Sequence, residues 1–251
     1  MPKYFKRLPL WLCVLLALTV GVLSATVQAA PAASPAPTKP PNPTHWWTAN
    51  NTARDRVGTD DGHLLNGVTY TRGFSGKAFH FNGQGSEVDF DAVGGNFNRD
   101  PFTIAFFIRS TSPLSQAIWN KRSVCNAASF WDFRMTGNLW GAELDGDELG
   151  TDDTGVTGAP IIADGNWHHV ALVRDGSNNT IYVDGANAQT AISPHPVLLS
   201  NTTPMRAGMD VCTGVDGTNP YNGDLDELMI FDQALTQQQI NTVISSLRGK
   251  P

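Results

Sequence analysis

Residues 164–185 read Asp-Gly-Asn-Trp-His-His-Val-Ala-Leu-Val-Arg-Asp-Gly-Ser-Asn-Asn-Thr-Ile-Tyr-Val-Asp-Gly and contain two runs rich in β-branched and aliphatic residues. Asp175-Gly176 separates the two runs, and Asp184-Gly185 closes the second. Asp-Gly pairs supply the positive φ angles that tight hairpin turns require. The segment therefore predicts two antiparallel strands, over residues 168–174 and 180–183.

Short runs of the same kind continue on both sides of this hairpin, separated by Gly, Asp, Asn and Pro. Strands are predicted at Phe79–Phe81, Glu87–Phe90, Phe102–Arg109, Ala117–Lys121, Phe130–Met135, Leu139–Leu144 and Leu225–Phe231. Many short strands with turns between them are typical of an all-β sandwich or barrel. Helical spacing appears only at the end, where Thr236-Gln237-Gln238-Gln239 has the form of a capping box before Ile240, Val243, Ile244 and Leu247. One short C-terminal helix should pack against the strands.

The N-terminus has the order of a secretory signal peptide. Three basic residues at positions 3–7 precede an apolar run over 8–23, and small residues follow in Val27-Gln28-Ala29. This order predicts a signal peptide over residues 1–29 and a secreted or cell-surface location. The apolar run is nearly long enough to span a bilayer, so a membrane anchor is the competing interpretation.

Residues 30–44 contain Pro, Ala, Ser and Thr with almost no large apolar side chain, so they cannot offset the entropy of ordering. They are predicted to be an extended linker, either a tether to a cell surface or a plain tail. One globular domain is predicted over 45–250. Removing the signal peptide takes away three basic residues and no acidic ones, which moves the net charge from -6 to -9. A surface that acidic argues against nucleic acid or anionic lipid as a partner.

Three cysteines are present, and Cys13 lies inside the apolar run, so it is discarded with the signal peptide. Cys125 and Cys212 remain in a chain predicted to meet an oxidising compartment. They are expected to form one disulfide, with two buried free thiols as the alternative. Neither has another cysteine or a histidine at the spacing of zinc ligands.

Five segments match those of a known family in the expected order: 76–83, 102–109, 164–174, 181–185 and 223–235. Together they resemble the laminin-G-like branch of the concanavalin A-like lectin/glucanase superfamily over essentially the whole mature domain. Trp167-His168-His169-Val170-Ala171 and Tyr182-Val183-Asp184-Gly185 are the most specific pieces, while Phe107 stands where such domains usually carry Trp. The resemblance implies a two-sheet antiparallel jelly-roll sandwich whose concave face binds glycans in many members. Fold alone does not fix function.

The candidate catalytic string is Glu143-Leu144-Asp145-Gly146-Asp147-Glu148, because laminarinase-type glucanases share this fold and carry their two catalytic carboxylates on one strand. Such a pair suits retaining hydrolysis. Gly146 and Asp147, however, stand where that family has apolar core residues, and the string looks like a strand that ends in a turn. His168 and His169 belong to the family's structural motif, and no Gly-x-Ser-x-Gly elbow is present. The domain is therefore predicted not to be an enzyme, with a divergent glucanase as the less favoured alternative.

A structural calcium ion is implied by the same resemblance. Asp226 falls on the position of a calcium-binding aspartate on the last long strand, and the carbonyl partners are expected around Gly83 and Trp46. Hard oxygen ligands suit calcium. The alternative is that Asp226 caps neighbouring backbone amides.

A ligand-binding face is predicted from strand alternation. Trp131 and Phe133 should face the core, so Asp132 and Arg134 face the other way, where Glu143 and either Asn120 or Arg122 could join them. The disulfide would bring Asp210 and Tyr221 near, and Trp119 and Tyr221 are the candidate aromatic platforms for a sugar ring. A solvated salt-bridge patch is the plainer interpretation.

The favoured function is a secreted, lectin-like module that binds a neutral or basic glycan weakly without cleaving it. A protein–protein adhesion or structural module, with a protein partner, is the alternative. On the sequence alone, Arg134→Ala is expected to weaken ligand binding roughly tenfold and to change folding little.

Overall fold

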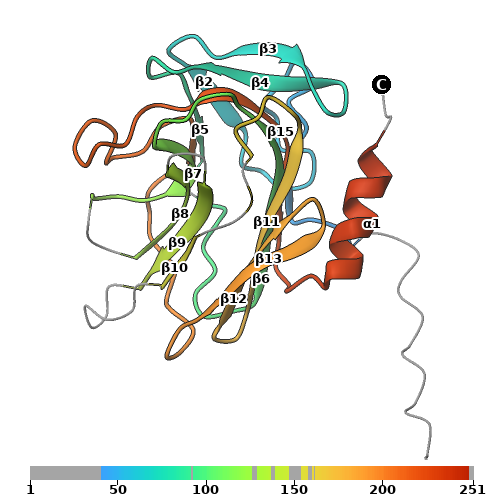
Figure 1. The fold of residues 1–251 in the computed structure, drawn as a ribbon, viewed down its shortest axis with the longest axis vertical. Coiled ribbons are helices and arrows are strands. Elements are labelled where there is room, and N and C mark those ends of the chain that lie inside the picture. Colours follow the sequence, from blue (N-terminus) through green and yellow to red (C-terminus); the bar gives the residue numbers. More distant parts are fainter. Residues whose placement is uncertain are drawn as a thin grey trace, which may run out of the picture. The chain divides into compact units, whose positions relative to one another are not determined.

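The computed structural model describes residues 41–91, 93–125, 129–136, 139–146, 154–157, 160 and 162–248. Its strands form two antiparallel sheets, as the sequence predicts, and one short C-terminal helix follows them (Figure 1). The predicted signal peptide lies outside the described residues. Thr44, assigned above to the linker, already donates its backbone amide to the Ile230 carbonyl at 2.8 Å, so the ordered domain includes it. No helix among the described residues is long and apolar enough to cross a membrane.

The first sheet has the order β13-β12-β11-β6-β15-β4-β3, and β1 pairs with β15 outside this path. Its strands are β1 (His45–Trp47), β3 (Thr69–Arg72), β4 (Lys77–Asn82), β6 (Phe102–Arg109), β11 (His168–Asp175), β12 (Asn178–Val183), β13 (Ala186–Ile192) and β15 (Asn222–Phe231).

The second sheet has the order β10-β9-β8-β7-β14-β5-β2. Its strands are β2 (Gly62–Leu65), β5 (Glu87–Phe90), β7 (Gln116–Lys121), β8 (Phe130–Thr136), β9 (Leu139–Asp145), β10 (Thr154–Thr157) and β14 (Arg206–Ala207). The strands β7 to β10 lie on the opposite side of the sandwich from the helix (Figure 1).

The hairpin of β11 and β12 has the turn that the sequence predicts. Val170 is paired with Val183 at one end and Asp175 with Asn178 at the other. Gly176 has a φ of 60°, and Asp184 has a φ of 51° where the second strand ends. These left-handed conformations explain why an Asp-Gly pair stands at each turn.

The main core lies between the two sheets and is largely aromatic. Trp119 makes edge-on contacts with Trp47, Phe106 and Trp131, at ring-centroid distances of 5.9, 5.7 and 5.6 Å. Aromatic pairs favour such geometry and bury a large apolar area. The core therefore fixes the curvature and spacing of β7 and β8, which carry the polar residues described below.

Helix α1 (Gln237–Leu247) covers the outer face of the first sheet. The Thr236 side chain accepts a hydrogen bond from the Gln239 backbone amide, and the Gln239 side chain accepts one from the Thr236 backbone amide. The predicted capping box is therefore present. Ile240, Val243 and Leu247 are buried in a second apolar layer against that sheet. The predicted amphipathic helix is confirmed, on the face away from the second sheet (Figure 1).

Candidate binding cleft

Strand β8 places two charged side chains on the face of the second sheet that points away from the core. Trp131 and Phe133 are buried in the main core, so Asp132 and Arg134 take the other face. The register sets Asp132 opposite Glu143 and Arg134 opposite Gly141 on β9. Strand alternation thus puts the three predicted polar residues on one face.

Arg134 is the centre of this arrangement. Its Nε lies 2.7 Å from Asp132 Oδ2, and its two terminal nitrogens lie 3.2 Å from Asp210 Oδ2 and 3.0 Å from Asp216 Oδ2. The planar guanidinium matches several carboxylates at once. Partial burial alone would lower the pKa of Arg134, but the surrounding carboxylates, Asp132 first among them, raise it well above its usual value.

A second arginine, Arg122, supports the first. Its guanidinium lies 2.8 Å from Asp132 Oδ2 and 3.6 Å from Glu143 Oε2, and it covers the Phe130 ring at 3.7 Å. Burial raises the pKa of Asp132, and the two guanidinium groups oppose the rise. Asn120, the other candidate, instead donates to backbone carbonyls of Arg206 and Met209. We call Arg122, Asp132, Arg134, Glu143, Asp210 and Asp216 the Arg134 cluster.

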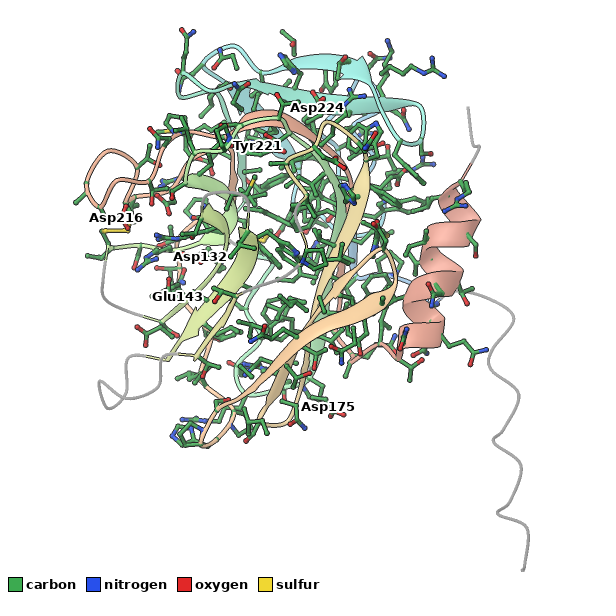
Figure 2. The ribbon with its side chains drawn as sticks, viewed as in Figure 1. Asp132, Glu143, Asp175, Asp216, Tyr221 and Asp224 are labelled. Atoms are coloured by element: carbon green, nitrogen blue, oxygen red, sulfur yellow. A yellow bond between two sulfur atoms is a disulfide. The ribbon has the colours of Figure 1, made fainter. Side chains whose placement is uncertain are left out.

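The predicted disulfide between Cys125 and Cys212 is present and holds the loop that completes this cluster. Asp210 Oδ1 accepts from the Cys212 amide at 2.8 Å, so the bridge and the carboxylate are fixed together. Asp216 lies close to the two sulfur atoms. Partial burial would raise the pKa of Asp216, but hydrogen bonds from Thr218 and Arg134 lower it to about 2. Figure 2 shows Asp132, Glu143 and Asp216 on the side of the sandwich that carries the disulfide.

A cleft of about 240 Å³ opens beside the cluster. It is lined by Asp132, Arg134, Thr136, Gly141, Ala142, Glu143, Gly155 and Thr157. Asp132 is 1% exposed, and its Oδ1 has no hydrogen-bond partner among the described residues. A buried acceptor without a donor costs free energy, so a donor that enters the cleft would be stabilised there.

The prediction that Trp119 and Tyr221 are aromatic platforms for a sugar ring is wrong. Trp119 and Tyr221 are both fully buried. Trp119 packs in the main core, and the Tyr221 hydroxyl donates to the Arg109 carbonyl at 3.1 Å. None of the residues that line the cleft is aromatic, and the half-buried rings of Trp46, Trp167 and Tyr182 lie outside this lining.

One of the two expected carbonyl partners of the calcium ion, Gly83, does not lie near Asp226. In the register of β15 with β4, Asn222 pairs with Asn82 and Leu225 with Phe79. Gly83 therefore lies about five residues, or roughly 16 Å, along the strand from the level of Asp226. The Trp46 carbonyl accepts the Arg56 amide at 2.9 Å. This contact leaves the second lone pair of the Trp46 carbonyl, so Trp46 stays a predicted partner while Gly83 does not.

Asp226 itself has the character of an unsatisfied buried acid. Its Oδ2 accepts the Ser75 amide at 2.9 Å, while its Oδ1 has no partner among the described residues. Burial raises the pKa of Asp226 to about 8, and the neighbouring Glu227 adds to the rise. One buried, unpaired carboxylate oxygen fits a hard cation, so a calcium ion held through Asp226 stays a prediction.

Ionisation of Asp226 gives a pH-dependent stability that can be measured. When a chelator has removed any bound cation, the Asp226 carboxyl group loses its proton near the ordinary pKa of 3.8 in the unfolded chain. In the folded chain it keeps the proton until about pH 8. Stability should fall between these values as the pH rises, by at most about 1.4 kcal/mol per pH unit. Urea unfolding of wild type and Asp226→Asn at pH 5 and pH 8 in EDTA should show a smaller loss in the variant.

Adding calcium tests whether Asp226 binds the ion. If the ion binds there, it should raise the unfolding midpoint of the wild type and not that of Asp226→Asn. Equal pH dependence in both proteins would contradict the high pKa. A calcium effect that survives in Asp226→Asn would place the ion elsewhere.

The catalytic candidates are not arranged for an obvious reaction. Glu143 lies on β9 with Asp145 on the same face, but Asp147 and Glu148 lie outside the described residues. His168 pairs with Asp184 at 2.8 Å and Asp164 at 3.1 Å. His169 is buried, which lowers its pKa to about 4.

Two curved antiparallel sheets with a charged cleft on one face define a jelly-roll binding module. The chain belongs to the concanavalin A-like lectin/glucanases superfamily, whose laminin-G family model matches residues 82–241. A stretch of 113 residues is 30% identical to the mouse basement membrane-specific heparan sulfate proteoglycan core protein, covering 43% of this chain and 3% of the proteoglycan.

Solved structures of toxin binding domains share the fold. The binding domain of Paraclostridial Mosquitocidal Protein 1 has a TM-score of 0.64 and 16% identity, over 79% of this chain and 52% of that one. The binding domain of botulinum neurotoxin DC in complex with rat synaptotagmin II has a TM-score of 0.65 and 16% identity, over 82% and 52%. The same domain in complex with SialylT has a TM-score of 0.64 and 17% identity, over 82% and 51%. The chain spans about half the length of these structures, and the likeness shows the fold alone.

Proposed function

We propose that this protein is a secreted, noncatalytic module that binds a neutral or basic glycan in the cleft beside the Arg134 cluster. The observation that carries the proposal is the buried, unpaired Oδ1 of Asp132, a residue that lines a cleft whose other charged groups are tied together. Sugar hydroxyls donate and accept hydrogen bonds, so a pyranose can supply the missing donor.

The cluster is built in advance of any ligand. Arg134 is held by three carboxylates, and two of these lie on a loop fixed by the disulfide. A preorganised polar site loses little entropy when a ligand binds. Because no aromatic residue lines the cleft, we expect weak affinity for a single sugar unit.

Similar proteins support a binding role outside the cell. Two of the similar structures are complexes, one with SialylT and one with rat synaptotagmin II, and the mouse relative is a basement membrane proteoglycan. We extend only the binding role to this chain. Its predicted signal peptide and its disulfide are consistent with export.

The contacts that Asp132 makes with two arginines disfavour hydrolysis. A retaining glycosidase needs a nucleophilic carboxylate and a second carboxyl group about 5 Å from it. Asp132 stands opposite Glu143, but its Oδ2 is held by both Arg122 and Arg134. A carboxylate neutralised by two guanidinium groups is a poor nucleophile and a poor acid.

Glycan-array binding by the purified mature protein tests the proposal, with a β-glucan hydrolysis assay beside it. We expect a small set of neutral or basic glycans to bind and no glucan turnover. Turnover by the wild type that Glu143→Gln abolishes would favour the glucanase alternative. An array without signal, with a protein captured instead at a surface away from the cleft, would favour the adhesion module.

A further inference from the structure

The Arg134 cluster carries more negative than positive charge. Two guanidinium groups face four carboxylates, so the cluster has two net negative charges when all six groups are ionised. Arg134 contacts three of the carboxylates, and Arg122 contacts Asp132 and the fourth, Glu143. The remaining residues that line the cleft are Thr136, Gly141, Ala142, Gly155 and Thr157, which are uncharged. Apart from Arg134, which is already counted in the cluster, the lining supplies no cation to balance the excess.

The unpaired atom of the lining residue Asp132 is also an acceptor. Both guanidinium contacts of Asp132 go to Oδ2, which leaves Oδ1 buried without a donor among the described residues. An ionised carboxylate only accepts hydrogen bonds, so the matching ligand group must donate. A hydroxyl group and a primary ammonium group both donate, but only the ammonium group also offsets the negative charge. Charge-assisted hydrogen bonds are about twice as strong as neutral ones.

We propose that the cleft selects a sugar unit with a free primary ammonium group, as in a glucosamine residue, and this rests on the proposed function of the cleft as a glycan site. The ammonium group donates towards Asp132 Oδ1 and lies in the field of Glu143 and Asp210. The volume of about 240 Å³ suits one sugar ring. N-acetylation removes the positive charge, and a carboxylated sugar is repelled by the same field.

Three β-1,4-linked disaccharides test this selection because they differ mainly at one position. The amino disaccharide of glucosamine, its N-acetylated form and the glucose disaccharide should be titrated into the disulfide-bonded mature protein at low salt. We expect the amino form to bind about tenfold more tightly than the other two. The preference should shrink at high salt, because the Debye length falls to about 3 Å at 1 M.

Two charge-matched variants locate the attraction. Glu143→Gln removes one negative charge from the cleft, and Asp175→Asn removes one from the exposed end of β11, away from the cleft (Figure 2). Glu143→Gln should weaken binding of the amino form about threefold or more, and more than it weakens binding of the glucose form. Asp175→Asn should leave the amino form bound as in the wild type.

The outcomes separate the inference from the proposed function. Equal affinity for the amino and glucose forms would overturn the ammonium selection and leave the cleft as a glycan site. An equal loss in Asp175→Asn and Glu143→Gln would show attraction by the whole acidic surface and would also overturn it. If none of the three disaccharides binds and the glycan array is blank, the proposed function fails as well.

Discussion

Replacing Cys212 with serine is expected to lower the free energy of unfolding by about 4 kcal/mol. The bridge joins residues 87 positions apart, and a loop of that length greatly restricts the unfolded chain. Cys212 is fully buried, so the serine hydroxyl would also be placed in an apolar site. The loss should appear as a lower urea midpoint, and the slope of the transition should increase because the unfolded chain is less compact without the bridge.

The matched controls for this prediction are chemical and genetic. Cys125→Ser and the double variant should lose about as much as Cys212→Ser, because each removes the same bridge. Reduction of the wild type should reproduce the loss. A reduced wild type with an unchanged midpoint would show that packing alone holds the loop of Asp210 and Asp216.

Much of the fold could be predicted because local signals and topology agree. The Asp-Gly pairs at 175–176 and 184–185 lie in the turns of the β11–β12 and β12–β13 hairpins, where left-handed backbone angles are observed. Period-two alternation in β8 separates Asp132 and Arg134 from the core. Such signals depend on a few neighbouring residues, which the sequence displays directly. The edge strand β13 escaped prediction because its residues are mostly exposed and small or polar and leave no alternation of large apolar side chains.

The errors in the candidate site have one physical source, which is long-range packing. In β7 every residue is buried, so alternation cannot tell which face of the strand meets a ligand, and Trp119 was wrongly assigned. Tyr221 reaches a carbonyl on β6 more than a hundred residues away. Gly83 was placed by resemblance and not by register, which only the pairing of β4 with β15 reveals.

Asp216 was missed altogether. It follows Cys212 in a turn-rich loop, which the disulfide links to the chain just before β8, and its carboxylate contacts Arg134 there. The parity of the cysteines predicts the bridge, but not which side of the loop faces the sheet. An acidic residue four positions after a paired cysteine was the available signal, and it is weak without the fold.

Arg134→Ala is expected to destabilise the protein strongly as well as to abolish its binding, which differs from the small effect on folding expected from the sequence. The guanidinium neutralises Asp132, which is 1% exposed, and Asp210, whose side chain is fully buried. Removing one partner of a buried ion pair leaves uncompensated charge and costs about 3 to 5 kcal/mol. Arg122 still contacts Asp132, so the lower end of that range applies to this carboxylate.

Three variants distinguish this charge effect from a general loss of side-chain contacts. Arg134→Lys keeps the charge but cannot contact three carboxylates with one planar group, so it should recover part of the stability and little of the ligand affinity. Arg54→Ala, at an exposed position, should change the free energy of unfolding by less than about 0.5 kcal/mol. Urea unfolding at neutral pH measures all three against the wild type. If Arg134→Ala unfolds like Arg54→Ala, the carboxylates of the cluster are solvated in solution, and the cleft is not the preorganised site on which the proposed function depends.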